Sequence, residues 1–279
     1  MSNSNQFLCG RYHLDLTRPH VMGIVNVTPD SFSDGGRYAS SQLALEHAMQ
    51  LVAAGADILD IGGESTRPNA VPVSLDEELS RVIPVIERLA KEVDVPLSID
   101  TYKPQVMREA VNAGAAIIND VRGLQEPGAM EVAAEGNAGV CLMHMKGVPQ
   151  TMQQDPVYED VVQEVKSFLL ERMQATLAAG ITAERIVLDP GFGFGKRTVH
   201  NIALLNALPE LLELGRPLLV GLSRKSVLGQ IIGSDVDQRL HASLAASVIS
   251  AMKGGRIVRV HDVKATVDAL KVVNAVINA

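Results

Sequence analysis

The sequence predicts a single (β/α)8 barrel, and two patterns carry this prediction. Short runs rich in Ile, Val and Leu alternate with longer helical patterns, and each run is apolar on both faces, as suits a parallel strand covered on both sides. A faint repeat between 54–60 and 113–119 is explained by one strand–helix unit used twice. The runs are 21–25, 58–61, 96–99, 116–118, 139–143, 185–188, 218–222 and 256–260. Eight such units in about 250 residues favour a barrel over an open doubly wound sheet, which usually has a glycine-rich fingerprint after its first strand.

The segments between the strands contain helix start and stop signals. Ser74 to Glu77 matches a capping box, in which both side chains bind backbone N–H groups. Pro104 suits a first helical turn, and Asp262 can cap a helix that follows it. Ala-Gly pairs at 54–55, 113–114 and 179–180 are expected to end three helices. The segment 7–16, with Gly10-Arg11 at its middle, predicts a short N-terminal hairpin that closes the bottom of the barrel.

Composition narrows the class of protein further. The chain has 279 residues, and we interpret 1–279 as one domain because no linker or low-complexity segment divides it. The net charge of −7 argues against a nucleic-acid or anionic-membrane partner. No apolar run reaches the roughly 18 residues of a membrane span, and the first residues do not resemble a secretion signal. With only two cysteines, the chain fits a reducing cytoplasm.

Polar side chains follow almost every predicted strand. In a (β/α)8 barrel these positions converge on one rim, where active sites lie. Buried polar groups are costly unless they are paired, so a purely structural barrel has no need of such a set. The residues are Asn26, Glu64 to Arg67, Asp100, Asn119-Asp120, His144, Asp189, Ser223 to Ser226, Arg259 and His261.

This set divides by chemistry. Asp100, Asn119 and Asp189 form a receptor for a flat heterocycle with several N–H donors. The cationic residues Arg67, Lys225, Arg259 and His261, helped by the Thr66 hydroxyl, suit a phosphate or a carboxylate. Asn26 offers a neutral oxygen that Mg2+ accepts beside phosphate oxygens and water.

The glycine-rich segment 190–196 invites a nucleotide-loop interpretation, which the sequence excludes. A Walker A motif would need glycine at Pro190 and Ser or Thr at Arg197. Phe32, Phe192 and Phe194 fall in rim loops of a chain with few aromatic residues, so we expect at least one to stack on a ring. The histidines show no zinc spacing.

The motifs together resemble the dihydropteroate synthase family. Residues 25–36 are similar to its first signature and 62–68 to its second, and 118–120, 188–196, 223–226 and 259–262 match as well. The resemblance covers the chain from about residue 10 to its end. It implies a (β/α)8 fold, a homodimer and a cytoplasmic step of folate biosynthesis. The reaction joins 4-aminobenzoate to the diphosphate ester of 6-hydroxymethyl-7,8-dihydropterin and releases diphosphate. Sulfonamides compete with 4-aminobenzoate in this family.

The resemblance also implies residue roles and a mechanism. Loss of diphosphate assisted by Mg2+ leaves a pterin cation, which the arylamine attacks, and the loops after the first two strands would close to exclude water. The implied catalytic residues are Asp100, Lys225 and Arg67. The pterin would contact Asp100, Asn119, Asp189, Lys225 and Phe194; the diphosphate Asn26, Thr66, Arg67, Arg259 and His261; and 4-aminobenzoate Phe32, Arg67, Pro68 and Ser226, with Asn26 on the metal.

Two rival functions remain open. A pterin-binding methyltransferase barrel would use the same carboxylate and amide receptor, but it has no need of the diphosphate group or of the segment 223–226. A non-catalytic binding protein would have no need of the phosphate and metal candidates. An assay of diphosphate release would distinguish these two functions from dihydropteroate synthesis.

Overall fold

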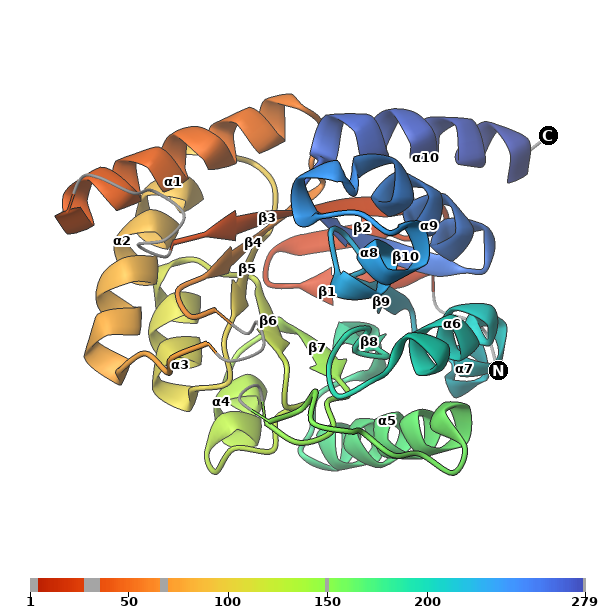
Figure 1. The fold of residues 1–279 in the computed structure, drawn as a ribbon. Helices are drawn as coiled ribbons and strands as arrows, with labels where there is room; N and C mark the ends of the chain where they lie inside the picture. The colour runs from red at the N-terminus through yellow and green to blue at the C-terminus, as the bar shows by residue number, and fades with distance from the viewer. Residues whose placement is uncertain (1–4, 28–35, 66–69, 149–150, 278–279) are drawn as a thin grey trace.

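A closed barrel of parallel strands forms the centre of the molecule in a computed structural model that describes residues 5–27, 36–65, 70–148 and 151–277 (Figure 1). The strands are β3 (His20–Asn26), β4 (Ile58–Gly62), β5 (Leu97–Asp100), β6 (Ile117–Asp120), β7 (Gly139–Met143), β8 (Ile186–Asp189), β9 (Leu218–Val220) and β10 (Gly255–Val260). They follow one another in chain order around the barrel, and β10 pairs with both β3 and β9 to close it. The predicted fold is confirmed, and the strand ends differ from the prediction by no more than two residues.

Helices surround the barrel on its outer side (Figure 1). They are α1 (Gly36–Ala53), α2 (Leu75–Glu92), α3 (Pro104–Ala113), α4 (Ala129–Glu135), α5 (Val161–Ala178), α6 (Thr198–Asn206), α7 (Leu208–Leu211), α8 (Ser226–Ile232), α9 (Leu240–Met252) and α10 (Val263–Ile277). Pro104 begins α3, and the three Ala-Gly pairs lie at the ends of α1, α3 and α5, as predicted. Gly114 has a φ of 117°, a left-handed conformation that glycine adopts without a steric penalty.

Two predicted helix caps differ from the structure. Ser74 Oγ accepts from the Glu77 N–H at 3.3 Å, but the Glu77 carboxylate pairs with Arg81, so only half of the capping box forms. Asp262 directly precedes α10, and its carboxylate binds the Arg224 guanidinium, with Nε 3.0 Å from Oδ2. In both places a charge-assisted bond to arginine takes the carboxylate, because it is stronger than a bond to a neutral amide.

The N-terminal hairpin is confirmed. Strands β1 (Gln6–Cys9) and β2 (Tyr12–Asp15) form a separate antiparallel pair whose turn contains Gly10 at a φ of 57°. Phe7 is buried against the barrel interior, within 3 Å of the position that a Cβ at Gly139 would occupy. The hairpin therefore closes the end of the barrel at which the strands begin.

Two apolar clusters hold the fold together. The larger lies between the strands and the helices and contains alternate strand residues such as Leu59 and Ile118. The smaller fills the barrel and joins Phe7, Cys9 and Leu16 of the N-terminal segment to one set of inward-facing strand residues. We call this set the inner apolar layer: Met22, Ile58, Ile117, Cys141, Val187, Leu219 and Ile257. Both cysteines are unpaired core residues.

A search of the described helices for one long and apolar enough to cross a membrane found none.

Candidate active site

On several strands of the inner apolar layer, the next residue that points into the barrel is polar. Successive side chains of a strand point to opposite faces, so the residue two positions further on points into the barrel again. Ile58, Ile117, Val187 and Ile257 are followed at that distance by Asp60, Asn119, Asp189 and Arg259. We call these four residues, with Asp100 at the end of β5, the polar layer. It lies toward the strand ends, where (β/α)8 enzymes carry their chemistry.

Arg259 joins two carboxylates of the polar layer. Its Nε donates to Asp60 Oδ2 at 2.6 Å, and a terminal nitrogen donates to Asp100 Oδ2 at 2.7 Å. The same Asp60 oxygen accepts from Asn119 Nδ2 at 3.1 Å. Burial alone would lower the pKa of Arg259, but Asp60 and Asp100 together raise it above its ordinary value. The guanidinium therefore stays charged and links β10 to β4 and β5.

Asp60 is a member that the sequence analysis did not single out. It lies in the middle of β4 rather than after its end, and it is completely buried. A single carboxylate within an apolar run, in phase with inward-facing Ile58, is the sequence feature that marks it.

The three residues of the predicted heterocycle receptor all lie in the last two residues of barrel strands. Asp100 ends β5 and Asn119 lies beside it in register on β6, while Asp189 ends β8 on another side of the barrel. Burial raises the pKa of Asp100 to about 7, which Arg259 opposes and Asp60 reinforces. Burial also raises the pKa of Asp189, although Lys225 and the Gly191 N–H, 2.7 Å from Oδ1, favour its charged form.

Lys225 reaches the same region from the residue before α8. Its Nζ donates to the Phe192 carbonyl and lies 4.5 Å from the centroid of the Phe194 ring. Burial lowers the pKa of Lys225 to about 8, in spite of the opposing effect of Asp189. Phe192 is completely buried in the outer core and cannot stack on a ligand, which leaves the partly exposed Phe194 as the described rim aromatic.

The loop after β8 is fixed by Lys196, the last residue of the family motif 188–196. Lys196 Nζ is buried and donates to the carbonyls of Gly191 at 2.8 Å and Phe194 at 3.1 Å. It also lies 2.9 Å from His144 Nδ1. Burial and the Lys196 charge lower the pKa of His144 to about 2, so this imidazole is neutral. A Cβ at Gly191 would overlap the His144 carbonyl oxygen, so the close approach requires glycine.

The segment that carries Lys225 and Ser226 contains a strained residue. Arg224 has a φ of 56°, uncommon for a side chain of this size, and its pair with Asp262 holds it in place. Ser223 Oγ lies 3.0 Å from His261 Nδ1, which ties the end of β10 to this turn. Ser226 is exposed as the first residue of α8.

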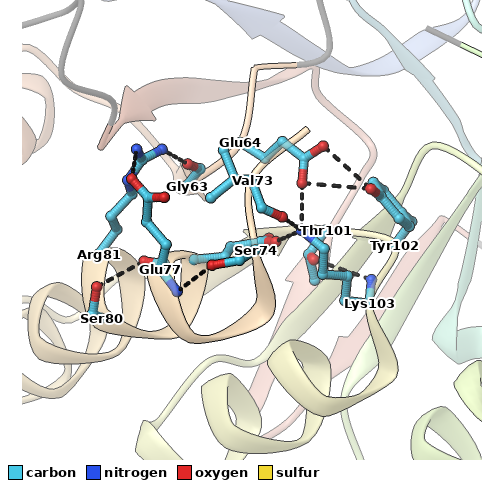
Figure 2. A network of polar contacts seen from close by, with 11 residues as sticks. Gly63, Glu64, Val73, Ser74, Glu77, Ser80, Arg81, Thr101, Tyr102 and Lys103 are labelled. Carbon is cyan, nitrogen blue, oxygen red and sulfur yellow. Dashed lines mark hydrogen bonds and ion pairs between the residues drawn. The ribbon is translucent and has the colours of Figure 1, made fainter. Parts of the chain in front are cut away.

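Figure 2 shows how the described parts of the loop after β4 are anchored. Glu64 accepts from the Lys103 ammonium and from the Tyr102 hydroxyl, the latter at 3.2 Å. Lys103 also donates to the Val73 carbonyl at 2.8 Å and pairs with buried Glu78. These bonds fasten both described ends of the loop to the segment after β5.

Four predicted site residues, Phe32, Thr66, Arg67 and Pro68, lie outside the described residues. Asn26 ends β3 beside Gly62 and is partly exposed. No group of three or more His, Cys, Asp or Glu side chains within the described ranges is arranged to hold a metal ion.

The chain matches a known class of barrel proteins, the pterin-binding enzymes. The family described as pterin binding enzyme matches residues 22–261. The chain is 55% identical over 266 residues to dihydropteroate synthase of Escherichia coli strain K12, covering 95% of this chain and 94% of the relative.

Solved structures agree with the sequence comparison. Dihydropteroate synthase of Xanthomonas albilineans with 4-aminobenzoic acid superimposes with a TM-score of 0.94 at 53% identity, covering 99% of each chain. A Yersinia pestis dihydropteroate synthase in a sulfonamide drug complex gives 0.94 at 51% identity, covering 98% of this chain and 100% of the other. The chain belongs to the dihydropteroate synthase family of pterin-binding enzymes.

Proposed function

We propose that this protein condenses the diphosphate ester of 6-hydroxymethyl-7,8-dihydropterin with 4-aminobenzoate, giving dihydropteroate and diphosphate. The observation that carries the proposal is the polar layer, in which three carboxylates and an amide line the barrel interior beside two cations, Lys225 and Arg259. A dihydropterin ring has amino and ring N–H donors and a carbonyl acceptor, so it complements such a set.

Each ring contact has a proposed partner. Asp100, Asn119 and Asp189 accept from the pterin donors, and Lys225 donates to its acceptors. Phe194 lies beside Lys225 and offers a ring face to the heterocycle. Asp100 Oδ1 is buried and, among the described residues, has no hydrogen-bond partner, so a ligand donor there would relieve its desolvation cost.

We assign the diphosphate to Asn26, Thr66, Arg67, Arg259 and His261. Asn26 and His261 follow neighbouring strands, β3 and β10, at the same end of the barrel. A Mg2+ ion fits Asn26 as a site that the substrate completes, because Mg2+ usually keeps several waters and binds phosphate oxygens with few protein ligands. Bound there, the ion would neutralise charge on the leaving diphosphate.

The reaction breaks the bond between the pterin methylene carbon and the diphosphate oxygen and forms a carbon–nitrogen bond to the arylamine, which then loses a proton. Positive charge develops on the pterin as diphosphate leaves, and the ionised carboxylates of Asp100 and Asp189 stabilise it. We place 4-aminobenzoate at Ser226, with Phe32, Arg67 and Pro68 as further contacts. The proposed catalytic residues are thus Asp100, Lys225 and Arg67.

The test is an assay of diphosphate release from the pterin diphosphate, with and without 4-aminobenzoate. Release coupled to 4-aminobenzoate, lost with a chelator and restored by Mg2+, is the expected result. Methyl transfer to the pterin without diphosphate release would instead identify a methyltransferase. Binding of pterin without turnover would identify a binding protein.

We further propose that the protein is a homodimer that acts in the cytoplasm as one domain of residues 1–279. An apolar groove of about 440 Å3 between α6 and α9 is lined by Val199, Ile202, Ala203, Leu205, Asn206, Ile249 and Lys253. Val199 and Ile202 are 63% and 49% exposed, an arrangement typical of a surface that a partner covers. Sedimentation of the wild type and of Ile202→Glu tests this: the wild type should be a dimer and the variant a folded monomer.

A further inference from the structure

Asp60 differs from the other carboxylates of the polar layer in its position. It lies deepest along its strand, two residues before Gly62, which pairs with Asp100. It is completely buried, and its Oδ2 accepts from both Asn119 and Arg259. A group in this place acts on a ligand through its neighbours.

A carboxylate at this point determines how the Asn119 amide is oriented. An ionised carboxylate only accepts hydrogen bonds, so the group that faces it at 3.1 Å must be the amide nitrogen. The reversed amide would bring two acceptor oxygens together. With Nδ2 held by Asp60, Asn119 presents Oδ1 on its other branch and therefore offers an acceptor, as Asp100 and Asp189 do.

The same oxygen holds the Arg259 guanidinium. Arg259 reaches across the barrel from β10, and its planar group spans Asp60 and Asp100. Charge-assisted bonds of this kind fix orientation as well as distance. Without Asp60, the guanidinium has one carboxylate left to hold it.

We propose that Asp60 is a positioning residue that sets ring specificity, by turning the Asn119 amide so that its oxygen accepts from the ligand and by holding Arg259 against Asp100. This proposal rests on the proposed function, because it takes the bound ring to be a pterin. It predicts that the site rejects a ring with a carbonyl where pterin has its amino group, because an acceptor would then face acceptors.

The experiment compares the affinities of 6-hydroxymethylpterin and its 2-oxo analogue, 6-hydroxymethyllumazine, by calorimetry. We expect the wild type to prefer the pterin by about 100-fold or more. Asp60→Asn frees the amide of Asn119 to rotate and should reduce this preference at least about tenfold. In an Asn119→Ala background, Asp60→Asn should change the preference less than it does in the wild-type background, because the part of its effect that acts through Asn119 is gone.

Asp120→Asn is the matched control. Asp120 is also a completely buried aspartate, on β6, but it accepts from the backbone N–H groups of Arg122 and Leu124 and has no hydrogen bond to Asn119 or Arg259 among the described residues. This variant should lose stability and keep the wild-type preference for pterin. If Asp60→Asn does not fold, Asn119→Ala alone decides: an unchanged preference there would overturn the proposal.

A second readout does not depend on pterin. Exchange of the Arg259 Nε–H, followed by NMR, should be at least about tenfold faster in Asp60→Asn than in the wild type, because a charged acceptor is replaced by a neutral one. A wild type that binds neither ring contradicts the proposed function, and the exchange rate then still tests Asp60. A folded Asp60→Asn protein with the wild-type preference would overturn the role of Asp60.

Discussion

The two ends of the barrel interior are formed by the same strands but carry opposite kinds of side chain, apolar at one end and polar at the other. At the end where the strands begin, the inner apolar layer packs against Phe7 and Leu16. Two residues further along the strands, carboxylates, an amide and a guanidinium of the polar layer lie in the same barrel interior. We expect the first end to stabilise the fold, and we propose that the second recognises a ligand.

The polar layer buries acceptor oxygens that have no hydrogen-bond partner among the described residues. They are Asp60 Oδ1 and Asp100 Oδ1. Desolvated acceptors of this kind destabilise a fold until something donates to them. Substitutions at the two ends should therefore separate stability from binding.

The largest effect is expected at the apolar end. Phe7→Ala removes a fully buried aromatic ring and leaves a cavity, which should lower the free energy of unfolding by about 3–5 kcal/mol in urea titrations. The half-exposed Tyr12 of the same hairpin is the control, and Tyr12→Ala should cost clearly less. Pterin affinity of the folded Phe7→Ala protein should be unchanged, and a matching loss of affinity would contradict the separation of the two ends.

Arg259→Ala should give the next largest effect, at the polar layer. It leaves Asp60 and Asp100 together without their cation and should cost about 3 kcal/mol of unfolding free energy, because an uncompensated buried charge is strongly destabilising. Arg108 and Glu135 form an exposed ion pair, so Arg108→Ala should cost less than about 1 kcal/mol. Equal costs in the two variants would show that the polar layer does not depend on its guanidinium.

Asp189→Ala should act on binding more than on folding. It leaves pterin donors without an acceptor and should weaken 6-hydroxymethylpterin binding by about 1–3 kcal/mol in calorimetry. Asp94 has an almost fully exposed carboxylate, and Asp94→Ala should leave this affinity at the wild-type value. Unchanged affinity in Asp189→Ala would remove this residue from the pterin site.

The difference between the two ends also explains how far the sequence could be interpreted. The positions of the strands, and of the polar residues Asp100, Asn119 and Asp189 at their ends, follow from local patterns. Apolar runs and the points at which they end are visible along the chain. Asp60 was missed because it interrupts a strand instead of ending it, and only its phase with Ile58 shows that it faces inward.

The sequence also could not show which polar side chains bind one another inside the barrel. Arg259, which we assign to the diphosphate, also pairs in the structure with carboxylates 159 and 199 positions away in the chain, and the sequence did not show this pairing. Lys196 and His144 also lie far apart in the chain, at 52 positions. Such pairings depend on the closure of the barrel, which no local pattern contains.

Asp100 of the polar layer and the neighbouring Lys225 should also give the enzyme a narrow pH optimum. With the pKa of Asp100 raised to about 7 and that of Lys225 lowered to about 8, kcat/KM for the pterin substrate should rise tenfold per pH unit up to about 7 and fall above about 8. Arginine remains protonated at these values, so Lys225→Arg should abolish the fall on the alkaline side. An alkaline limb that persists in this variant would assign it to another group.

Stability should follow the same two groups with opposite signs. Asp100 binds its proton more tightly in the folded protein than at its ordinary pKa of 3.8, so its contribution to stability falls as the pH rises from about 4 to 7. Buried Asp120, with its pKa raised to about 6, acts in the same direction. Lys225 binds its proton less tightly when folded, so its contribution rises between about pH 8 and 10. Asp100→Asn should flatten the acidic part of the unfolding profile, and an unchanged slope would contradict the raised pKa.

The smallest effect is expected outside both layers, at Ser226. Loss of one hydroxyl that binds the 4-aminobenzoate carboxylate should raise the KM for this substrate by a few-fold, about 1 kcal/mol, and leave the KM for the pterin unchanged. Thr198 occupies the matching first position of α6, and Thr198→Ala should change neither constant. Equal rises in both constants for Ser226→Ala would mean that the start of α8 supports the polar layer. A rise confined to 4-aminobenzoate would place the second substrate at the exposed rim, beyond the carboxylates that hold the first.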